Sequence, residues 1–201
     1  MWLELLVLVL IFVVFLFFVF WRFYFLREPA RHVPQGNNLV SPANGRVIKV
    51  FRFGKEKVDM SKGFGRIIDI ARDVGDEGWI IVIFMSPFDV HVQRAPFSSK
   101  ITKVKYTKGK FFNANEIQPE NEKNEIVLQD ITLKIKVIQV AGLIARRIEC
   151  FVKERQEVLK GQRIGRINLG SQVIVVIPKN MNPKVKEGQV VIDGETIIAE
   201  F

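Results

Sequence analysis

The sequence has few of the residues that build disulfides and metal centres. Its 201 residues include one cysteine, Cys150, and two histidines, His32 and His91. One cysteine excludes an internal disulfide and a zinc site made of several cysteines, and two histidines disfavour a histidine-rich metal centre. A lone cysteine also suits a reducing compartment. We therefore expect a protein without a bound metal, whose chemistry depends on other groups.

Patterns typical of two further classes of protein are also missing. No RNA-binding or helix-turn-helix signature is present, so the net charge of +9, scattered from Arg22 to Lys186, favours anionic lipid over nucleic acid as the partner. A membrane-tethered adaptor with a lipoyl-like domain would need a long heptad-patterned helical hairpin, and none is visible. We predict contact with anionic phospholipid and none with nucleic acid, and keep the adaptor as an alternative.

One long apolar run is present, at the N-terminus. Residues 1–21 hold a single charge, and Arg22, Arg27 and Arg31 follow closely. About 20 apolar residues cross a bilayer as a helix, and arginines gather on the cytoplasmic side of such helices. A signal peptide would have a basic segment before the run and a cleavage site of small residues after it. We predict a single-pass anchor in the cell membrane at residues 1–26, with the rest of the chain cytoplasmic.

The remainder of the chain has the pattern of a β protein. Residues 27–38 form a polar linker, and residues 39–201 contain short runs rich in Ile and Val, separated by turn residues. The segment that starts at Val152 is repeated from Val185, 33 residues later, and each copy reads as strand, tight turn and strand. Similar hairpins occur in lipoyl and biotinyl carrier domains. We predict a mainly β fold, a pseudo-symmetric barrel-sandwich hybrid, behind one transmembrane helix.

A Gly-Ser pair, Gly170-Ser171, interrupts the apolar run of residues 165–178. A glycine inside a strand pattern marks a bulge or a close approach to the backbone, and the serine hydroxyl is a nucleophile wherever a base lies near it. For the pair alone, a bulge with a hydrogen-bonded hydroxyl is the simpler interpretation. The choice between the two depends on the rest of the chain.

Two other segments combine turn residues with chemically active side chains. Residues 84–96, FMSPFDVHVQRAP, present Asp89, His91 and Arg94 where a very apolar strand ends, between two prolines. Residues 40–50, VSPANGRVIKV, open a strand with an Asn-Gly turn. Taken singly, the first segment is explained by a histidine that caps a turn, and the second by an Asn-Gly pair that favours a tight turn.

Together these segments resemble the phosphatidylserine decarboxylase family over nearly all of residues 39–201. The short length and the single N-terminal anchor are similar to the compact archaeal and bacterial branch, which includes archaetidylserine decarboxylases. The segments that carry the resemblance occur in the family's order: SPANGRV, FMSPFDVHVQRAP, YTKGKFFNA, NEKNEI, VAGLIARRI, KGQRIG and LGS.

The resemblance implies a proenzyme that cuts itself between Gly170 and Ser171. In the family, the serine hydroxyl attacks the glycine carbonyl, the resulting ester is eliminated, and the serine becomes a pyruvoyl group. That group, which in this chain would form from Ser171, is the cofactor. The products would be a β chain, residues 1–170, and an α chain, residues 171–201, which stay together in one fold. A homo-oligomer is compatible with this organisation.

The same resemblance implies an activity and the residues that perform it. The pyruvoyl ketone would condense with the serine headgroup of a phospholipid, phosphatidylserine or archaetidylserine, and release carbon dioxide to leave the ethanolamine lipid. His91 matches the family's motif histidine, as base in self-cleavage and as proton donor after decarboxylation. Some members have a second histidine where this chain has Arg94, so Arg94 is a candidate for binding phosphate or carboxylate. Lys110 and Phe111 are further candidates for substrate binding.

The chain departs from the family pattern at Asn44, where most members have an aspartate. That aspartate is thought to complete an Asp-His-Ser arrangement in which it orients His91 toward Ser171. An asparagine is neutral and can favour the wrong tautomer of the histidine. The sequence therefore predicts slow or incomplete self-cleavage, restored by Asn44→Asp. An uncleaved precursor or a pseudoenzyme is the alternative function.

Overall fold

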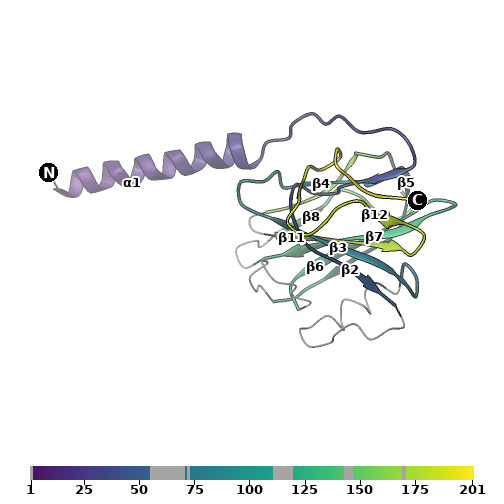
Figure 1. Ribbon diagram of the computed structural model, residues 1–201. Helices are drawn as coiled ribbons and strands as arrows, with labels where there is room; N and C mark the ends of the chain where they lie inside the picture. The colour runs from purple at the N-terminus through teal and green to yellow at the C-terminus, as the bar shows by residue number, and fades with distance from the viewer. Residues whose placement is uncertain (1, 55–70, 72, 111–119, 143–146, 169–170) are drawn as a thin grey trace.

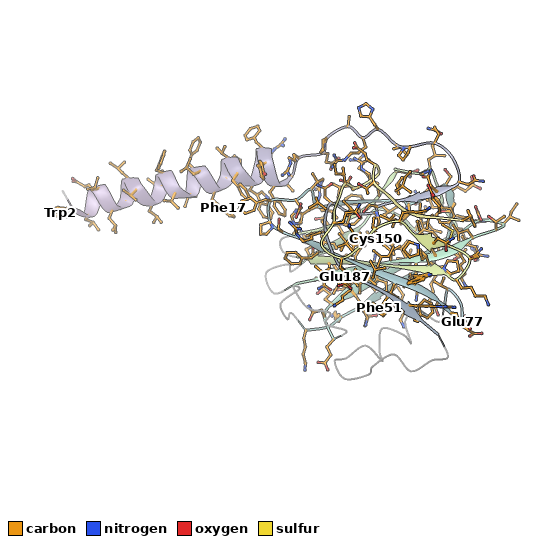
Figure 2. The ribbon with its side chains drawn as sticks, in the orientation of Figure 1. Trp2, Phe17, Phe51, Glu77, Cys150 and Glu187 are labelled. Atoms are coloured by element: carbon orange, nitrogen blue, oxygen red, sulfur yellow. The ribbon has the colours of Figure 1, made fainter. Side chains whose placement is uncertain are left out.

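The computed structural model describes residues 2–54, 71, 73–110, 120–142, 147–168 and 171–201. An N-terminal α-helix, α1 (Trp2–Val19), continues into a π-helical turn, η1 (Phe20–Phe25), and projects from one end of a β domain (Figure 1). The side chains of α1 point away from it on all sides, and none is buried (Figure 2). Residues Trp2–Phe25 form a helix long and apolar enough to cross a membrane.

Within the residues that the structure describes, the β domain contains fourteen strands, most of them short. They are β1 (Asn38–Val40), β2 (Gly45–Phe53), β3 (Gly78–Met85), β4 (Val92–Arg94), β5 (Ser99–Thr107), β6 (Lys123–Gln129), β7 (Lys134–Ala141), β8 (Ile148–Cys150), β9 (Glu157–Val158), β10 (Arg163–Ile167), β11 (Ser171–Pro178), β12 (Asn182–Pro183), β13 (Val190–Val191) and β14 (Ile197–Glu200).

These strands form one large sheet and two small ones. The large, curled sheet has the order β13-β2-β3-β11-β7-β6-β5-β9, and the small sheets have the orders β1-β14-β12 and β4-β10-β8. β11 pairs antiparallel with β3 on one edge and with β7 on the other, so it lies in the interior of the large sheet. The prediction of a mainly β fold with one N-terminal helix is confirmed.

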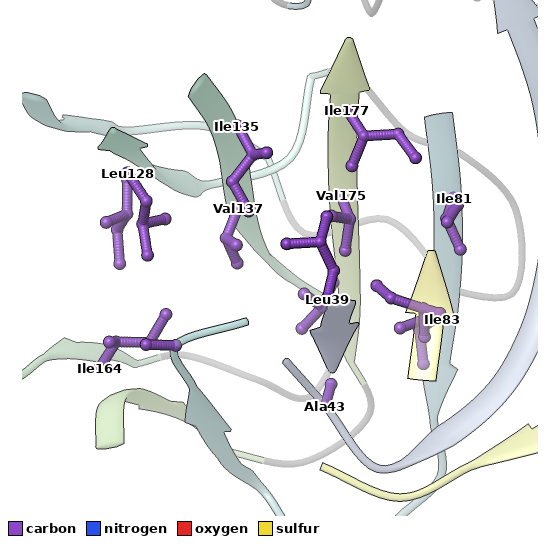
Figure 3. Close-up of a cluster of buried hydrophobic side chains, with 14 of the residues drawn as sticks. Leu39, Ala43, Ile81, Ile83, Leu128, Ile135, Val137, Ile164, Val175 and Ile177 are labelled. Carbon is purple, nitrogen blue, oxygen red and sulfur yellow. The ribbon is translucent and has the colours of Figure 1, made fainter. Parts of the chain in front are cut away.

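The main core lies between the large sheet and the two small ones. Figure 3 shows Leu39 and Ile164 from the small sheets facing Leu128, Val137 and Val175 of the large one, and all of them belong to one buried cluster. A second buried cluster covers the opposite face of the large sheet. β11 contributes alternate residues to both clusters, which explains its continuous apolar run. Because side chains alternate along a strand, that of Ser171 points to the face of β11 that packs into the main core.

The internal repeat appears as a pseudo-two-fold relation between two halves of the domain. The first strands of the two copies, β9 and β13, lie at opposite edges of the large sheet, and the second strands, β10 and β14, each lie at the centre of a small sheet. Gly161 and Gly194 occupy equivalent turns, with φ angles of 79° and 74°. Both are in the left-handed region, which a glycine adopts without a steric cost.

The predicted linker lies along the β domain and is attached to it by charged groups. Glu28 forms ion pairs with Arg163 and Arg166, and Arg31 forms one with Asp193. These contacts hold the chain that leaves the helix against β10 and against the turn between β13 and β14. The end of the apolar helix therefore has a defined position relative to the β3–β4 loop, which carries His91.

Candidate active site

Ser171 is the first residue of β11 and is fully buried. It lies in register with Met85 of β3 and with Ala141 of β7. Its Oγ is 3.6 Å from the Met85 Sδ. Gly170, the other half of the expected cleavage site, lies outside the described residues. Because β11 is paired on both edges, the sheet fixes the backbone at Ser171.

His91 lies in the loop between β3 and β4, and its side chain is buried. Its Nδ1 is 2.9 Å from the backbone oxygen of Asp89. The ring packs on Phe25, at the end of the apolar helix, with 4.2 Å between ring centroids. Its Nε2 has no hydrogen-bond partner within the part of the chain that the structure describes.

This geometry selects one tautomer of the His91 imidazole. A carbonyl oxygen can only accept, so Nδ1 carries the proton and donates it, which leaves a lone pair on Nε2. Burial lowers the pKa of His91 from 6.5 to about 4, against the smaller opposing effect of the Asp89 backbone. The imidazole is therefore neutral near pH 7. A buried, unpaired and unprotonated Nε2 is a group that can accept a proton from a hydroxyl.

Buried polar side chains, which the sequence analysis did not single out, connect the surroundings of Ser171 and His91. Gln93 Nε2 donates to the His91 backbone oxygen at 2.9 Å and lies 3.6 Å from the same Met85 sulfur that contacts Ser171. Gln139 Nε2 donates to Gln93 Oε1 at 2.8 Å. Charged residues accompany the glutamine in both strands, so the local sequence pattern did not mark either glutamine as a buried polar group.

Asn44 lies in the turn before β2 and interacts with the turn between β13 and β14. Its Oδ1 accepts from the Asp193 backbone N–H at 3.0 Å and from Arg31 Nη2 at 3.3 Å. In the equivalent turn of the other half, Ser98 Oγ accepts from the Lys160 N–H at 3.0 Å. No hydrogen bond to His91 is seen for Asn44 among the described residues. The amide thus has a structural role here, and a role in self-cleavage stays a prediction.

Arg94 forms an ion pair with the buried Asp193. Arg94 Nε lies 2.7 Å from one carboxylate oxygen of Asp193, and Arg31 Nη2 lies 2.5 Å from the other. Arg94 Nη1 also donates to the Gly161 backbone oxygen at 3.0 Å. Binding of a substrate anion by Arg94 would require it to share or exchange these partners, and it stays a prediction.

The remaining two candidates lie at the edge of the described residues. Lys110 forms an ion pair with Glu120, with 3.0 Å between Nζ and the carboxylate, and both side chains are largely exposed. Phe111 lies outside the described residues. The structure therefore leaves the substrate-binding roles of Lys110 and Phe111 as predictions.

The surroundings of Asn44 lead to a prediction for Asn44→Asp. Two arginines surround Asp193, so a carboxylate at position 44 would balance their charge, and we expect it to raise the free energy of unfolding by about 1 kcal/mol. For the rate of self-cleavage, the geometry at His91 favours a different outcome from the rescue that the family pattern implies. We expect little change, because the Asp89 carbonyl already sets the tautomer of His91. Thermal unfolding and a time course of chain cleavage, each beside the parent sequence, measure the two effects.

Two results would contradict this prediction. A rate increase of roughly tenfold or more would show that a carboxylate at position 44 acts on the histidine, as the sequence-based expectation has it. A lowered unfolding temperature would show that the added charge is not balanced by the two arginines.

Comparison with known proteins assigns the chain to a family. Residues 18–199 match the family model described as Phosphatidylserine decarboxylase. The chain belongs to the phosphatidylserine decarboxylase family. The match covers the end of the apolar helix, the linker and almost the whole β domain, and the family resemblance inferred from the seven segments is confirmed.

Named members of the phosphatidylserine decarboxylase family align with most of the chain. Two are named "Putative archaetidylserine decarboxylase proenzyme": one from Methanocaldococcus jannaschii, 39% identical over 88% of this chain and 87% of its own length, and one from Methanothermobacter thermautotrophicus, 41% identical over 88% and 79%. A "Phosphatidylserine decarboxylase proenzyme" from Syntrophus aciditrophicus is 38% identical over 89% and 78%.

Proposed function

We propose that this protein is a self-cleaving, pyruvoyl-dependent decarboxylase that converts a serine-headgroup phospholipid, phosphatidylserine or archaetidylserine, into the ethanolamine lipid. Family membership supports the reaction class, and the names of the relatives support both lipid classes. The observation that carries the proposal is the location of Ser171. A fully buried serine begins a central strand, and through Met85 it adjoins a cluster that includes a neutral histidine, whose Nε2 has no hydrogen-bond partner among the described residues.

Self-cleavage needs a nucleophile, a base and a route for one proton. The Ser171 hydroxyl oxygen attacks the carbonyl carbon of residue 170, the C–N bond breaks, and an ester links the two residues. The hydroxyl proton passes to His91 Nε2 and then to the departing amino group. Elimination then removes the Ser171 Cα proton and expels the carboxylate of residue 170, and hydrolysis of the dehydroalanine releases ammonia and leaves the pyruvoyl group.

The residues around Ser171 fit such a group. Once formed, a pyruvoyl group supplies a ketone that withdraws the electrons released when carbon dioxide leaves. The side chains of Ser171 and His91 are buried, and so are those of Gln93 and Gln139, whose amide groups are hydrogen-bonded to each other. Protonation of His91 places a positive charge in a buried site, which costs free energy. The protonated form therefore gives its proton up easily. This suits a group that must both take and return a proton.

Decarboxylation in proteoliposomes tests the proposed function. Processed protein should release carbon dioxide from lipid labelled in the serine carboxylate, and the ethanolamine lipid should appear in equal amount. Reduction with borohydride should abolish the reaction by destroying the ketone. Ester-linked and ether-linked lipids, tested in parallel, distinguish the two substrate classes. Fully processed protein that acts on neither lipid would overturn the proposal, and protein that stays a single chain would indicate a precursor or a pseudoenzyme.

We also propose that the β domain lies on the cytoplasmic side of the membrane. Arg22 and Arg27 follow the apolar run directly, and Arg27 is held at the helix end by its bond to the Tyr24 oxygen, 2.8 Å long. Such charges favour the cytoplasmic side. Protease added to sealed, right-side-out vesicles should leave the domain intact, and digestion from outside would show the opposite orientation.

A further inference from the structure

A rigid turn next to His91 presents a large apolar side chain to the outside. In the turn Ser86–Asp89, the Asp89 N–H donates to the Ser86 oxygen, and the Asp89 carboxylate accepts from both the Ser86 N–H and the Ser86 hydroxyl, each at 2.7 Å. Pro87 further restricts the backbone. Phe88, at the tip, is 65% exposed. A single exposed ring on a protein surface needs no partner, but a contiguous patch of exposed apolar side chains marks an interaction surface.

The tip of this turn is continuous with the end of the apolar helix. The Phe88 ring meets the Phe20 ring edge-on, with 6.4 Å between centroids. Arg27 Nη2 donates to the Phe88 backbone oxygen at 2.6 Å. Phe23 and Tyr24, on the same helix end, are also exposed. The exposed aromatic rings therefore extend from the helix onto the loop that precedes His91.

Positive charge accompanies these aromatic side chains. Arg27 lies over the Tyr24 ring, 4.0 Å from its centroid. Arg27 and Arg166 both lie close enough to His91 to lower its pKa, although less than burial does. Aromatic rings mixed with arginines are typical of the membrane–water interface, where the rings lie among the headgroups and the arginines meet lipid phosphates.

We propose that the turn Ser86–Asp89 is a second membrane contact, in which Phe88 enters the interfacial layer of an anionic bilayer beside the end of the apolar helix. The membrane contact itself does not depend on the proposed function. Only the use suggested for it, delivery of a lipid headgroup to the site, rests on that function. With Phe88 in the headgroup layer, the loop that carries His91 lies close to that layer, and His91 itself is buried three residues further on. A serine headgroup could then reach the site while its tails stay in the membrane.

Site-specific fluorescence in the full-length protein tests this contact. In a Cys150→Ser background, Phe88→Cys is labelled with the polarity-sensitive dye NBD, and the protein is placed in vesicles of phosphatidylcholine and phosphatidylglycerol. The matched control is Ile131→Cys. Ile131 is fully exposed in the β6–β7 turn, and the strand register puts that turn at the end of the large sheet opposite to Ser171.

The label at position 88 should show a blue-shifted emission and lose most of its intensity to spin-labelled lipids, whereas the label at position 131 should show neither effect. Equal behaviour of the two labels, or water-like emission from position 88, would overturn the proposal. Unfolding curves of both labelled proteins verify the fold. The readout needs no decarboxylation, so absence of lipid turnover would count against the proposed function and not against this contact.

Discussion

Replacing Ser171 by alanine is expected to leave a single chain of 201 residues. For the parent protein, the proposed cleavage predicts two chains, residues 1–170 and 171–201. The substitution removes the only hydroxyl at the start of β11 and therefore the nucleophile of the proposed cleavage. It removes one atom from a site whose backbone is held by two neighbouring strands. We expect the fold to persist, so that loss of cleavage reports on chemistry. Intact-mass measurement and a denaturing gel after long incubation measure the effect.

Another buried serine supplies the matched control for Ser171→Ala. Ser99, at the start of β5, is also buried, and its hydroxyl donates to the Phe97 backbone oxygen at 3.4 Å. Ser99→Ala should be processed like the parent protein. The parent's short chain should begin with a blocked, carbonyl-containing residue 171. Two chains from Ser171→Ala, or a free serine amine at that terminus in the parent, would disprove the proposed cleavage.

Much of the fold could be predicted from local patterns in the sequence. Alternation of apolar and polar residues predicted strands, and the repeat predicted two equivalent strand–turn–strand units, because both copies have a glycine where the turn needs a positive φ: Gly161 and Gly194. The two strands of each unit lie in different sheets, so the units are not paired hairpins. The order of the strands in three sheets could not be predicted this way. It depends on how distant hairpins pack against one another, which leaves no local pattern in the sequence.

The candidate site was predictable in its motif residues and not in their partners. Ser171 and His91 stand out because each interrupts or ends an apolar strand pattern. By contrast, the contacts of Arg94 and Asn44 with the buried Asp193 join residues about 100 and 150 positions apart. The packing of Phe25 on His91 also depends on how the linker attaches to the domain. Such contacts are products of the tertiary structure, and only the coordinates reveal them.

Replacing His91 by glutamine is expected to slow self-cleavage by about 10²–10⁴-fold, the usual contribution of a positioned general base. A glutamine amide can still donate to the Asp89 carbonyl and can fill most of the space against Phe25, but it cannot accept a proton at neutral pH. The time course of chain cleavage measures the effect. His32→Gln is the control, because His32 is exposed and its side chain takes no part in the cluster around Ser171. Equal rates for the parent and His91→Gln would rule out the histidine as the base.

The pH dependence of cleavage provides a second, independent test of His91. Its pKa is lowered to about 4 by burial, so the parent's cleavage rate should be flat near neutrality and fall as the pH drops through about 4, where Nε2 becomes protonated.

The free energy of unfolding should change over a different pH range from the cleavage rate. The unfolded chain binds the proton near pH 6.5 and the folded chain only near 4, so stability is full above 6.5 and declines as the pH falls between these values. Circular dichroism at each pH separates unfolding from loss of the base. A rate that already falls by half near pH 6.5, with the fold intact, would mean that the catalytic histidine is hydrated and not buried under Phe25.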